Sequence, residues 1–297
     1  MSSPDYRVGT ASWTDPTLLA AGFYPPTCTN AEARLRFYSQ HFNMVEIDAT
    51  YYALPSERNA VLWAARTPSD FRFGVKAFAW LTQHQAEARA LPRTIRDQLP
   101  SSHRRQPRLS APSANARALA FEMFHAALEP LRAAGKLGCL LFQFPPWFTA
   151  SNQNREYILR CRDWCKGDRL AVEFRHASWF GERREHTFEF LRTNELVYVS
   201  VDAPRAASIP PPLCVATGDT AYIRFHGRNR PAWFRGGATA AERFKYFYAE
   251  SELCDWVTRV RRLRNVRTVY AVFNNCYADY GVANAATMRR LLESSAA

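Results

Sequence analysis

The chain has 297 residues, with 39 Lys and Arg against 27 Asp and Glu, so its formal net charge is +12. A hydrophobic content of 47% is enough for a packed core and excludes a disordered, collagen-like or coiled-coil protein. That length fits one large domain or two small ones. Only four basic residues are lysines, namely Lys76, Lys136, Lys166 and Lys245, and the arginine excess favours recognition of carboxylate or phosphate groups.

The seven cysteines are scattered and form no Cys-x-x-Cys pair, which argues against a secreted disulfide framework. Met1 to Asp5 contain no basic segment followed by an apolar one, and the longest apolar runs, such as 138–144, are too short to cross a bilayer. We therefore expect a cytoplasmic protein with no membrane partner. The sequence leaves the oligomeric state open.

Eight short segments rich in β-branched and aromatic residues predict β-strands. They are Arg7–Ser12, Met44–Ile47, Phe71–Lys76, Gly138–Gln143, Leu170–Phe174, Leu196–Val201, Ala221–Phe225 and Thr268–Phe273. Between residues 7 and 268 they begin about 37 residues apart on average. This spacing is typical of a (β/α)8 TIM barrel, an α/β fold of roughly 250 residues. We therefore expect one barrel domain over residues 7–293.

Helices are predicted between most of these strands, several of them after a capping residue such as Asn30, Ser56 or Ser113. They cover Ala31–His41, Glu57–Arg66, a stretch from Ser113 to Gly135 kinked at Pro130, Asn152–Cys165, Glu182–Thr193, Ala240–Leu263 and Asn284–Glu293. The sixth crossover, 203–220, contains four prolines and is predicted to be an irregular loop.

Long loops are predicted after the third strand, at 77–112, and after the seventh, at 227–238. Long loops in a compact domain are often functional. Within the first loop, the Arg-rich run 100–108 is either functional or a solvated excursion.

Side chains alternate along a strand, so each strand has one face toward the helices and one toward the barrel interior. We take the apolar set of each strand to face the helices; in the sixth strand this set is Val197, Val199 and Val201. The residues then predicted to face inward near the strand ends are Trp13, Glu46, Asp48, Lys76, Gln143, Glu173, Arg175, Ser200, Asp202, Arg224, His226 and Asn274. They form a polar bowl at the carboxyl end, where barrel enzymes place their active sites.

Charges buried in such a bowl require partners or a ligand, and an internal salt-bridge network is the structural alternative to a binding site. Glycine- and arginine-rich segments at 227–230 and 235–237, together with 274–275, lie where barrels commonly bind phosphate. Five tryptophans near strand ends are candidates for stacking on a ligand: Trp13, Trp80, Trp147, Trp179 and Trp233.

Seven motifs occur in order along the chain: VGTASW (8–13), VEIDATYY (45–52), FRFGVK (71–76), LFQFPP (141–146), AVEFRH (171–176), YIRFHGR (222–228) and VFNN (272–275). Together they closely resemble the YecE-like family of uncharacterised proteins. The resemblance implies a TIM barrel but no reaction. It places the family pattern on Trp13, Glu46, Tyr51, Lys76, His84, Gln143, Glu173, Arg175, His176, Trp179, Asp202, Arg224, His226 and Asn274. Two departures are Gln83, inserted into a Thr-His pair, and Asp48, where the family often has Asn.

We therefore expect a metal-independent enzyme, a hydrolase or lyase, that acts on a small phosphate- or carboxylate-bearing molecule. The catalytic candidates are Glu173, Asp202, His226 and Lys76. The substrate-binding candidates are Trp13, Glu46, Tyr51, Gln143, Arg175, His176, Trp179, Arg224, Arg228 and Asn274. A carboxylate would act as acid and base while cations clamp the anion. Lys76 is expected to stay charged among the carboxylates rather than become a Schiff-base nucleophile.

Three alternatives remain open. A divalent-metal hydrolase or isomerase would use Glu46, Glu173, Asp202 and His226 as ligands. A glycosidase would need Glu173 and Asp202 about 5 to 10 Å apart. A nucleic-acid-binding protein would use the aromatic rim with Arg104, Arg105, Arg108, Arg228, Arg230 and Arg235. Motifs for nucleotide binding, zinc proteases and serine hydrolases are absent, so no cofactor is expected outside the metal alternative.

Overall fold

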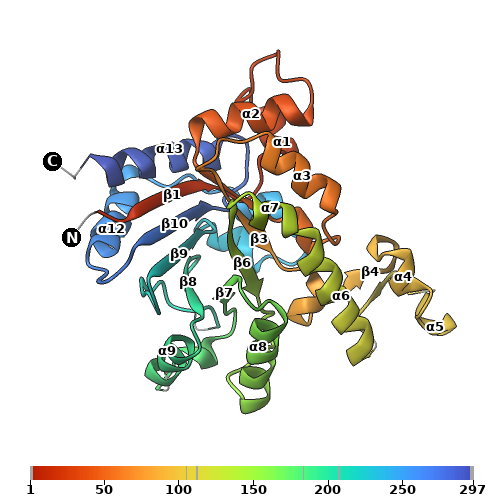
Figure 1. Cartoon of the computed structure of the whole chain (residues 1–297). Coiled ribbons are helices and arrows are strands. Elements are labelled where there is room, and N and C mark those ends of the chain that lie inside the picture. The colour runs from red at the N-terminus through yellow and green to blue at the C-terminus, as the bar shows by residue number, and fades with distance from the viewer. Residues whose placement is uncertain (1–2, 105, 112, 183, 207, 295–297) are drawn as a thin grey trace.

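The computed structural model describes residues 3–104, 106–111, 113–182, 184–206 and 208–294. Its centre is a sheet of eight parallel strands. The strands are β1 (Asp5–Thr10), β2 (Met44–Ile47), β3 (Arg72–Lys76), β6 (Leu137–Gln143), β7 (Arg169–Glu173), β8 (Val197–Asp202), β9 (Thr220–Phe225) and β10 (Thr268–Phe273). They pair in the order β1-β10-β9-β8-β7-β6-β3-β2, and a bridge from Ala11 to Glu46 joins the two edge strands. The predicted barrel is confirmed (Figure 1).

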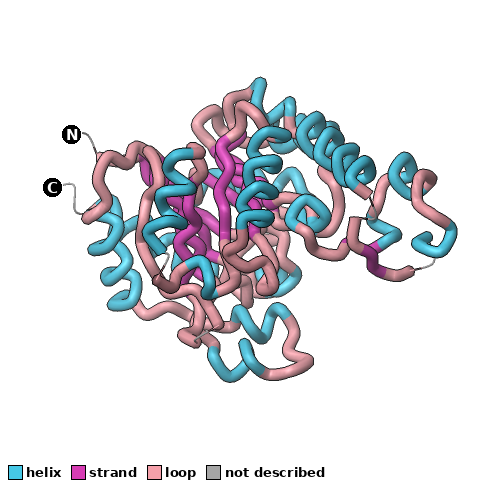
Figure 2. The backbone as a smooth tube through the Cα atoms, turned by 90° about the horizontal axis from the view of Figure 1, so that it is seen from below, coloured by secondary structure: helices cyan, strands magenta, loops and turns pink. Residues whose placement is uncertain are grey.

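Helices surround the strands on the outside of the barrel (Figure 2). The longer ones are α2 (Ala31–His41), α3 (Glu57–Ala65), α6 (Ala114–Ala127), α8 (Asn152–Trp164), α9 (Arg184–Thr193), α12 (Glu250–Arg261) and α13 (Tyr280–Glu293). Shorter elements are α1 (Pro16–Ala20), α7 (Glu129–Ala133), α10 (Arg230–Phe234), α11 (Ala240–Phe244) and the 3₁₀ turns η1 (Ala49–Tyr51), η2 (Ala79–Thr82) and η4 (Ala177–Trp179). The side chains of Asn30, Ser56 and Ser113 accept backbone N–H bonds as predicted caps.

Two predicted helices are each divided in the structure. The stretch from Ser113 breaks at Leu128, and Pro130 lies in the first turn of α7, where its missing N–H costs nothing. The stretch 240–263 forms α11 and α12, because the chain between them turns inward to bury Tyr248. Asn284 holds that segment by bonding both the N–H and the carbonyl of Tyr248.

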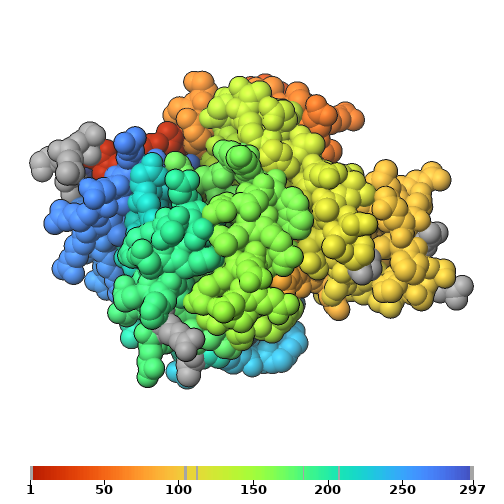
Figure 3. Space-filling view, turned by 60° about the horizontal axis from the view of Figure 1, so that its bottom comes forward, coloured from red at the N-terminus to blue at the C-terminus, as the bar shows by residue number. Residues whose placement is uncertain are grey.

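The long segment after β3 folds against the barrel and projects beside α6 (Figures 1 and 3). It contains a two-stranded antiparallel pair, β4 (Ala86–Glu87) with β5 (Arg108–Leu109), and the short helices η3 (Ala88–Ala90), α4 (Arg93–Arg96) and α5 (Ser101–Arg104). The Trp80 indole donates to the Leu109 carbonyl at 2.8 Å, and the Tyr157 hydroxyl of α8 donates to the Leu81 carbonyl at 2.9 Å. The sixth crossover, in contrast, has no helix at 203–206 or 208–219, as predicted.

The barrel interior and the surrounding helix layer have separate apolar clusters. In β8, Val197, Val199 and Val201 belong to the interior cluster, which is the reverse of the prediction. The register agrees, because Val201 pairs with the inward Arg224 and Asp202 pairs with the outward Phe225. The prediction for this strand was wrong because barrel interiors are themselves filled with branched apolar side chains. No helix among the described residues is both long enough and apolar enough to cross a membrane.

Candidate functional site

Arg224 lies at the centre of a buried charge network in the upper barrel. Its two terminal nitrogens donate separately, one to Glu46 Oε1 at 2.6 Å and the other to Glu173 Oε2 at 2.7 Å. The Tyr222 hydroxyl donates to the second oxygen of Glu46 at 2.7 Å. The three charged side chains are at most 1% exposed. Burial alone would lower the pKa of Arg224, but Glu46 and Glu173 outweigh it and raise that pKa.

Glu173 also receives three polar groups at Oε1. Gln143 Nε2 donates to it at 2.8 Å, Arg175 Nε lies 2.5 Å away, and His226 Nε2 lies 3.3 Å away. Although burial favours the neutral acid, Arg175 and Arg224 hold the pKa of Glu173 well below its usual range. Glu173 therefore remains a carboxylate and is a poor proton donor, contrary to its predicted acid/base role.

His226 links the network to β10. Its Nε2 lies 3.0 Å from an Arg175 nitrogen, and its Nδ1 lies 2.8 Å from the Asn274 amide. Burial, followed by the charge of Arg175, lowers the pKa of His226 to about 3. The ring is therefore neutral near pH 7, with one nitrogen as donor and the other as acceptor.

Asp48 and Lys76 form a second, more accessible layer above this network. Both are half-buried, at the carboxyl ends of the neighbouring strands β2 and β3. Neither side chain has a hydrogen bond or ion pair to any residue that the structure describes, and the Lys76 ammonium lies 4.4 Å from the centre of the Tyr51 ring. Burial raises the pKa of Asp48 to about 6, although Lys76 opposes the shift. The pair is therefore close to titrating at physiological pH.

A row of aromatic rings borders this layer. Tyr52, Tyr51, His84 and Trp147 follow one another with ring centres 5.1, 5.3 and 5.8 Å apart. The outer members, Tyr52 and Trp147, are each 64% exposed. Burial and the nearby Lys76 lower the pKa of His84 to about 4, so that ring is neutral. The rim thus brings an aromatic surface beside the unpaired charges.

Asp202 does not lie in the bowl. It accepts hydrogen bonds from Trp256 at 2.6 Å and Tyr248 at 2.8 Å, both on the helix side of the sheet. Arg228 makes two further bonds to it and an ion pair with Glu252. The prediction of Asp202 as an inward catalytic group was wrong because the valines of β8 face the barrel interior and Asp202 faces the helices. Arg228, predicted to bind substrate, instead belongs to this cluster on the helix side of the sheet.

Several other predicted site residues do not join the network, and Trp179 and Trp13 belong to the apolar cluster of the helix layer. Trp179 is fully buried and stacks on the outward Phe174, with its indole bonded to the Phe148 carbonyl. Trp13 is 8% exposed and packs edge-on against Trp63 of α3. His176 Nδ1 accepts the Ser178 N–H that begins η4. Trp80 is buried, whereas Trp233 is half-buried with its ring 6.3 Å from His226.

The position of Asp202 also bears on two alternatives. The predicted metal ligands do not converge, and no group of three or more His, Cys, Asp or Glu among the described residues is placed to hold a metal. The glycosidase alternative also fails, because Glu173 and Asp202 lie on opposite faces of the sheet and cannot flank one sugar.

Of the arginines in the nucleic-acid alternative, Arg105 lies outside the described residues and Arg235 pairs with Glu242, while Arg108 and Arg230 are exposed.

Comparison with known proteins agrees with the barrel. A family model described as protein of unknown function DUF72 matches residues 7–297. The chain belongs to the DUF72 family. UPF0759 protein YunF of Bacillus subtilis (strain 168) is 31% identical over 293 residues, covering 96% of this chain and 94% of the relative. UPF0759 protein YecE of Escherichia coli (strain K12) is 34% identical over 82 residues, 28% of this chain and 26% of the relative. The YecE-like resemblance is confirmed.

Solved DUF72 structures have the same fold. A DUF72 family protein from Thermotoga maritima has a TM-score of 0.76 and 32% identity, covering 97% of this chain and 99% of that one. A DUF72 family protein from Enterococcus faecalis has a TM-score of 0.77 and 24% identity, covering 97% and 95%. These similarities establish the family and the fold of this DUF72 protein.

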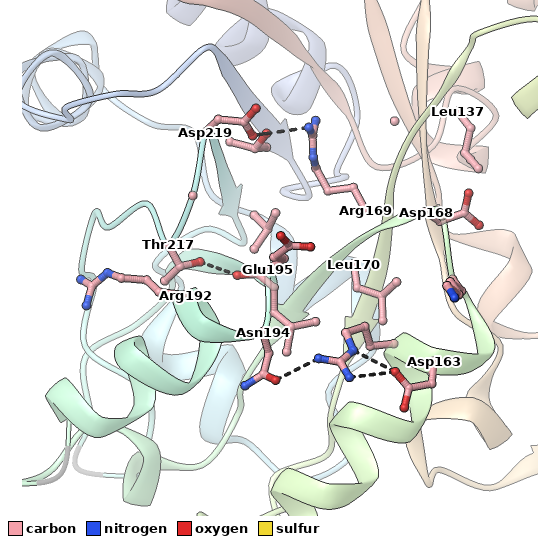
Figure 4. A pocket seen from close by; sticks show the side chains of 18 of the residues that line it. Leu137, Asp163, Asp168, Arg169, Leu170, Arg192, Asn194, Glu195, Thr217 and Asp219 are labelled. Carbon is pink, nitrogen blue, oxygen red and sulfur yellow. Dashed lines mark hydrogen bonds and ion pairs between the residues drawn. The ribbon is translucent and has the colours of Figure 1, made fainter.

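A cavity of about 1180 Å³ lies at the opposite end of the barrel. The starts of β6 to β9 line it, together with the last turns of α7, α8 and α9 and the chain that follows each helix (Figure 4). Its charged side chains largely pair with one another: Arg132 with Asp168, Arg162 with Asp163 and Asn194, and Arg169 with Asp219. The amino-terminal face of barrels usually serves stability, and these pairs fit that role.

Sequence reasoning underused three groups that the structure brings to the site. Asp48 was placed inward but left out of the catalytic set, although it has the same parity as Glu46. Tyr222 has the same parity as Arg224, two residues later, and that alternation was the signal. His84 was indicated by the family resemblance alone, because no strand register reaches it.

Proposed function

We propose that this DUF72 protein is an enzyme that acts on a small anionic substrate by acid–base catalysis at the carboxyl end of its barrel. The supporting observation is the charge balance there. Arg224 and Arg175 are matched by Glu46 and Glu173, so the deep network is neutral in itself. Lys76 is then a cation with no carboxylate oxygen in ion-pair range among the described residues, and a bound anion would supply the missing partner.

Asp48 is the group best suited to move protons. A catalytic acid or base works best with a pKa near the operating pH, and the pKa of Asp48, about 6, meets that condition. Glu173 stays ionised and Asp202 faces the helices, so neither takes this role. The deep network instead orients Arg175, whose side chain is 19% exposed and which, like Lys76, lowers the pKa of the rim residue His84 by its charge.

Anion binding tests the proposal directly. Phosphate, pyruvate, dihydroxyacetone phosphate and glucose 6-phosphate are added to the purified protein, and the melting temperature is followed, because a ligand that binds only the folded state stabilises it. Lys76→Met is expected to remove the anion-dependent shift. Lys166→Met, the same change at an exposed lysine near the opposite end, is the matched control. Equal responses of wild type and Lys76→Met to every anion would reject the proposed site.

A further inference from the structure

Two lysines of this chain are held inside the fold in contrasting ways. Lys136 donates to the carbonyls of Ala64 and Thr67 at 2.6 and 2.7 Å and to the Thr67 hydroxyl at 3.2 Å. All three protons of its ammonium therefore have acceptors. Lys76 has no such acceptor in the described part of the chain, and its contact is the face of the Tyr51 ring. Burial lowers the pKa of Lys136 as well, but three acceptors stabilise its ammonium form, whereas the ammonium of Lys76 has none among the described residues.

The charged groups that shift the pKa of Lys76 come from three strands, β2, β7 and β9. Glu46 and Asp48 come from β2 and its end, Glu173 from β7 and Arg224 from β9. Burial and the like charge of Arg224 outweigh these carboxylates and lower the pKa of Lys76 to about 8. Lys76 is therefore still mostly charged near pH 7, as expected, but it loses its proton more readily than an ordinary lysine. Desolvation and a neighbouring cation are the two conditions that turn a lysine into a nucleophile.

We propose that Lys76 is the covalent nucleophile of the site and forms an imine with an anionic aldehyde or ketone. This inference deepens the proposed function, on which it rests, by naming the reactive group of the substrate. The geometry supports it: the amine lacks a competing acceptor, is half-buried at the barrel mouth, and lies one strand from Asp48.

The covalent step balances with the groups on hand. The unprotonated Lys76 amine attacks the carbonyl carbon, a C–N bond forms, and the carbonyl oxygen takes up a proton as the nitrogen loses one. The resulting carbinolamine loses its hydroxyl as water, with Asp48 in its protonated form donating the proton. The nitrogen gives up its second proton, leaving the imine and one water molecule. Arg175 is the cation left to hold the anionic group of the substrate.

The four lysines of the chain make the experiment specific. Wild-type protein is incubated separately with pyruvate, glyoxylate, dihydroxyacetone phosphate and glyceraldehyde 3-phosphate, reduced with borohydride, digested and analysed by mass spectrometry. We expect an adduct on the peptide that contains Lys76, with the mass of the carbonyl compound less one oxygen atom. Lys136, Lys166 and Lys245 are internal controls. No adduct on Lys76 with any of the four probes, or equal labelling of Lys76 and exposed Lys166, would overturn the inference.

A pH series and a charge-conserving variant separate this inference from the proposed function. Labelling of Lys76 by limiting acetic anhydride should rise with an apparent pKa near 8; a midpoint above 10 would count against a nucleophile. Lys76→Arg should retain the anion-dependent stabilisation and lose the adduct. Anion binding without an adduct in wild type rejects the imine alone. Absence of anion binding rejects the proposed function as well.

Discussion

The two ends of this barrel use charge in different ways. At the amino-terminal end, a cavity of about 1180 Å³ is lined by charged side chains that are largely paired with one another; in one such pair, Arg169 and Asp219 are 42% and 45% exposed. At the carboxyl end, the charges of Glu46, Glu173 and Arg224 are fully buried, and two ionisable groups above them have no partner among the described residues. Under the proposed function, we therefore expect chemistry at the carboxyl end, where unpaired charge lies next to a buried, neutral network, and not at the amino-terminal cavity.

The largest difference between the ends should appear when one cation is removed from each. Arg224→Met leaves Glu46 and Glu173 buried without their shared partner, and breaking a buried pair in this way costs about 3 to 5 kcal/mol. Arg169→Met removes the exposed pair with Asp219, which is worth about 0 to 1 kcal/mol. Urea unfolding measures both. Equal losses of stability would mean that the buried network at the carboxyl end contributes no more to stability than an exposed ion pair.

Two carboxylates near the carboxyl end sharpen the comparison between structural and functional charge. Asp202→Asn places an amide against the donors of Trp256, Tyr248 and Arg228, so stability should fall by about 2 to 3 kcal/mol. Asp48→Asn should be neutral or stabilising, because burial disfavours the ionised Asp48 in the folded state. If an anion that stabilises the protein is also turned over, Asp48→Asn should abolish that turnover. Destabilisation by Asp48→Asn as large as that by Asp202→Asn would contradict this division.

Sequence reasoning reached the barrel because each strand is short, apolar and followed by a recognisable helix or loop signal. It also placed Glu46, Glu173, Arg224 and His226 on one inner face, since polar residues alternate with apolar ones in β2, β7 and β9. The same rule failed in β8, where the apolar face, Val197, Val199 and Val201, lines the barrel interior instead of packing against the helices. Only the register against β9 resolves that strand.

The pairing within the bowl lay beyond the reach of the sequence. The alternation of side chains places Lys76 inward but does not predict which carboxylates pair with Arg224. In the structure Arg224 forms ion pairs with both Glu46 and Glu173, which leaves Lys76 without a carboxylate partner. The contact between the rings of Trp147 and His84 could not be predicted either, because both lie on loops whose paths depend on the segment folded after β3.

A pH series tests whether the deep network depends on a neutral histidine. The pKa of His226 is about 3 in the folded protein and about 6.5 in an unfolded chain. The unfolded state therefore takes up a proton first, so stability is full above pH 6.5 and falls toward pH 3, by at most about 1.4 kcal/mol per pH unit. His84 acts in the same direction, whereas Asp48, with its raised pKa, partly opposes the fall below pH 6.

His226→Asn removes one titrating group and should flatten the dependence of unfolding free energy on pH between 6.5 and 5. The absolute stability of this variant does not matter for the test, because the slope is the measured quantity. A slope identical to that of wild type would show that folding does not lower the pKa of His226, and the neutral network would then be incorrect.

The smallest expected effect concerns the aromatic rim. Trp147 is 64% exposed, so Trp147→Ala should change stability by no more than about 0.5 kcal/mol. If its ring stacks on the substrate, binding of glucose 6-phosphate should weaken by about 0.5 to 1.5 kcal/mol, roughly twofold to twelvefold. Binding of inorganic phosphate, which has no ring to stack, should stay the same.

The matched control is Trp164→Ala at the end of α8, a 36% exposed ring that packs on Phe121. That variant should lose stability and retain both ligands. Equal weakening of both ligands by Trp147→Ala would assign the rim to the shape of the bowl instead of to contact with substrate.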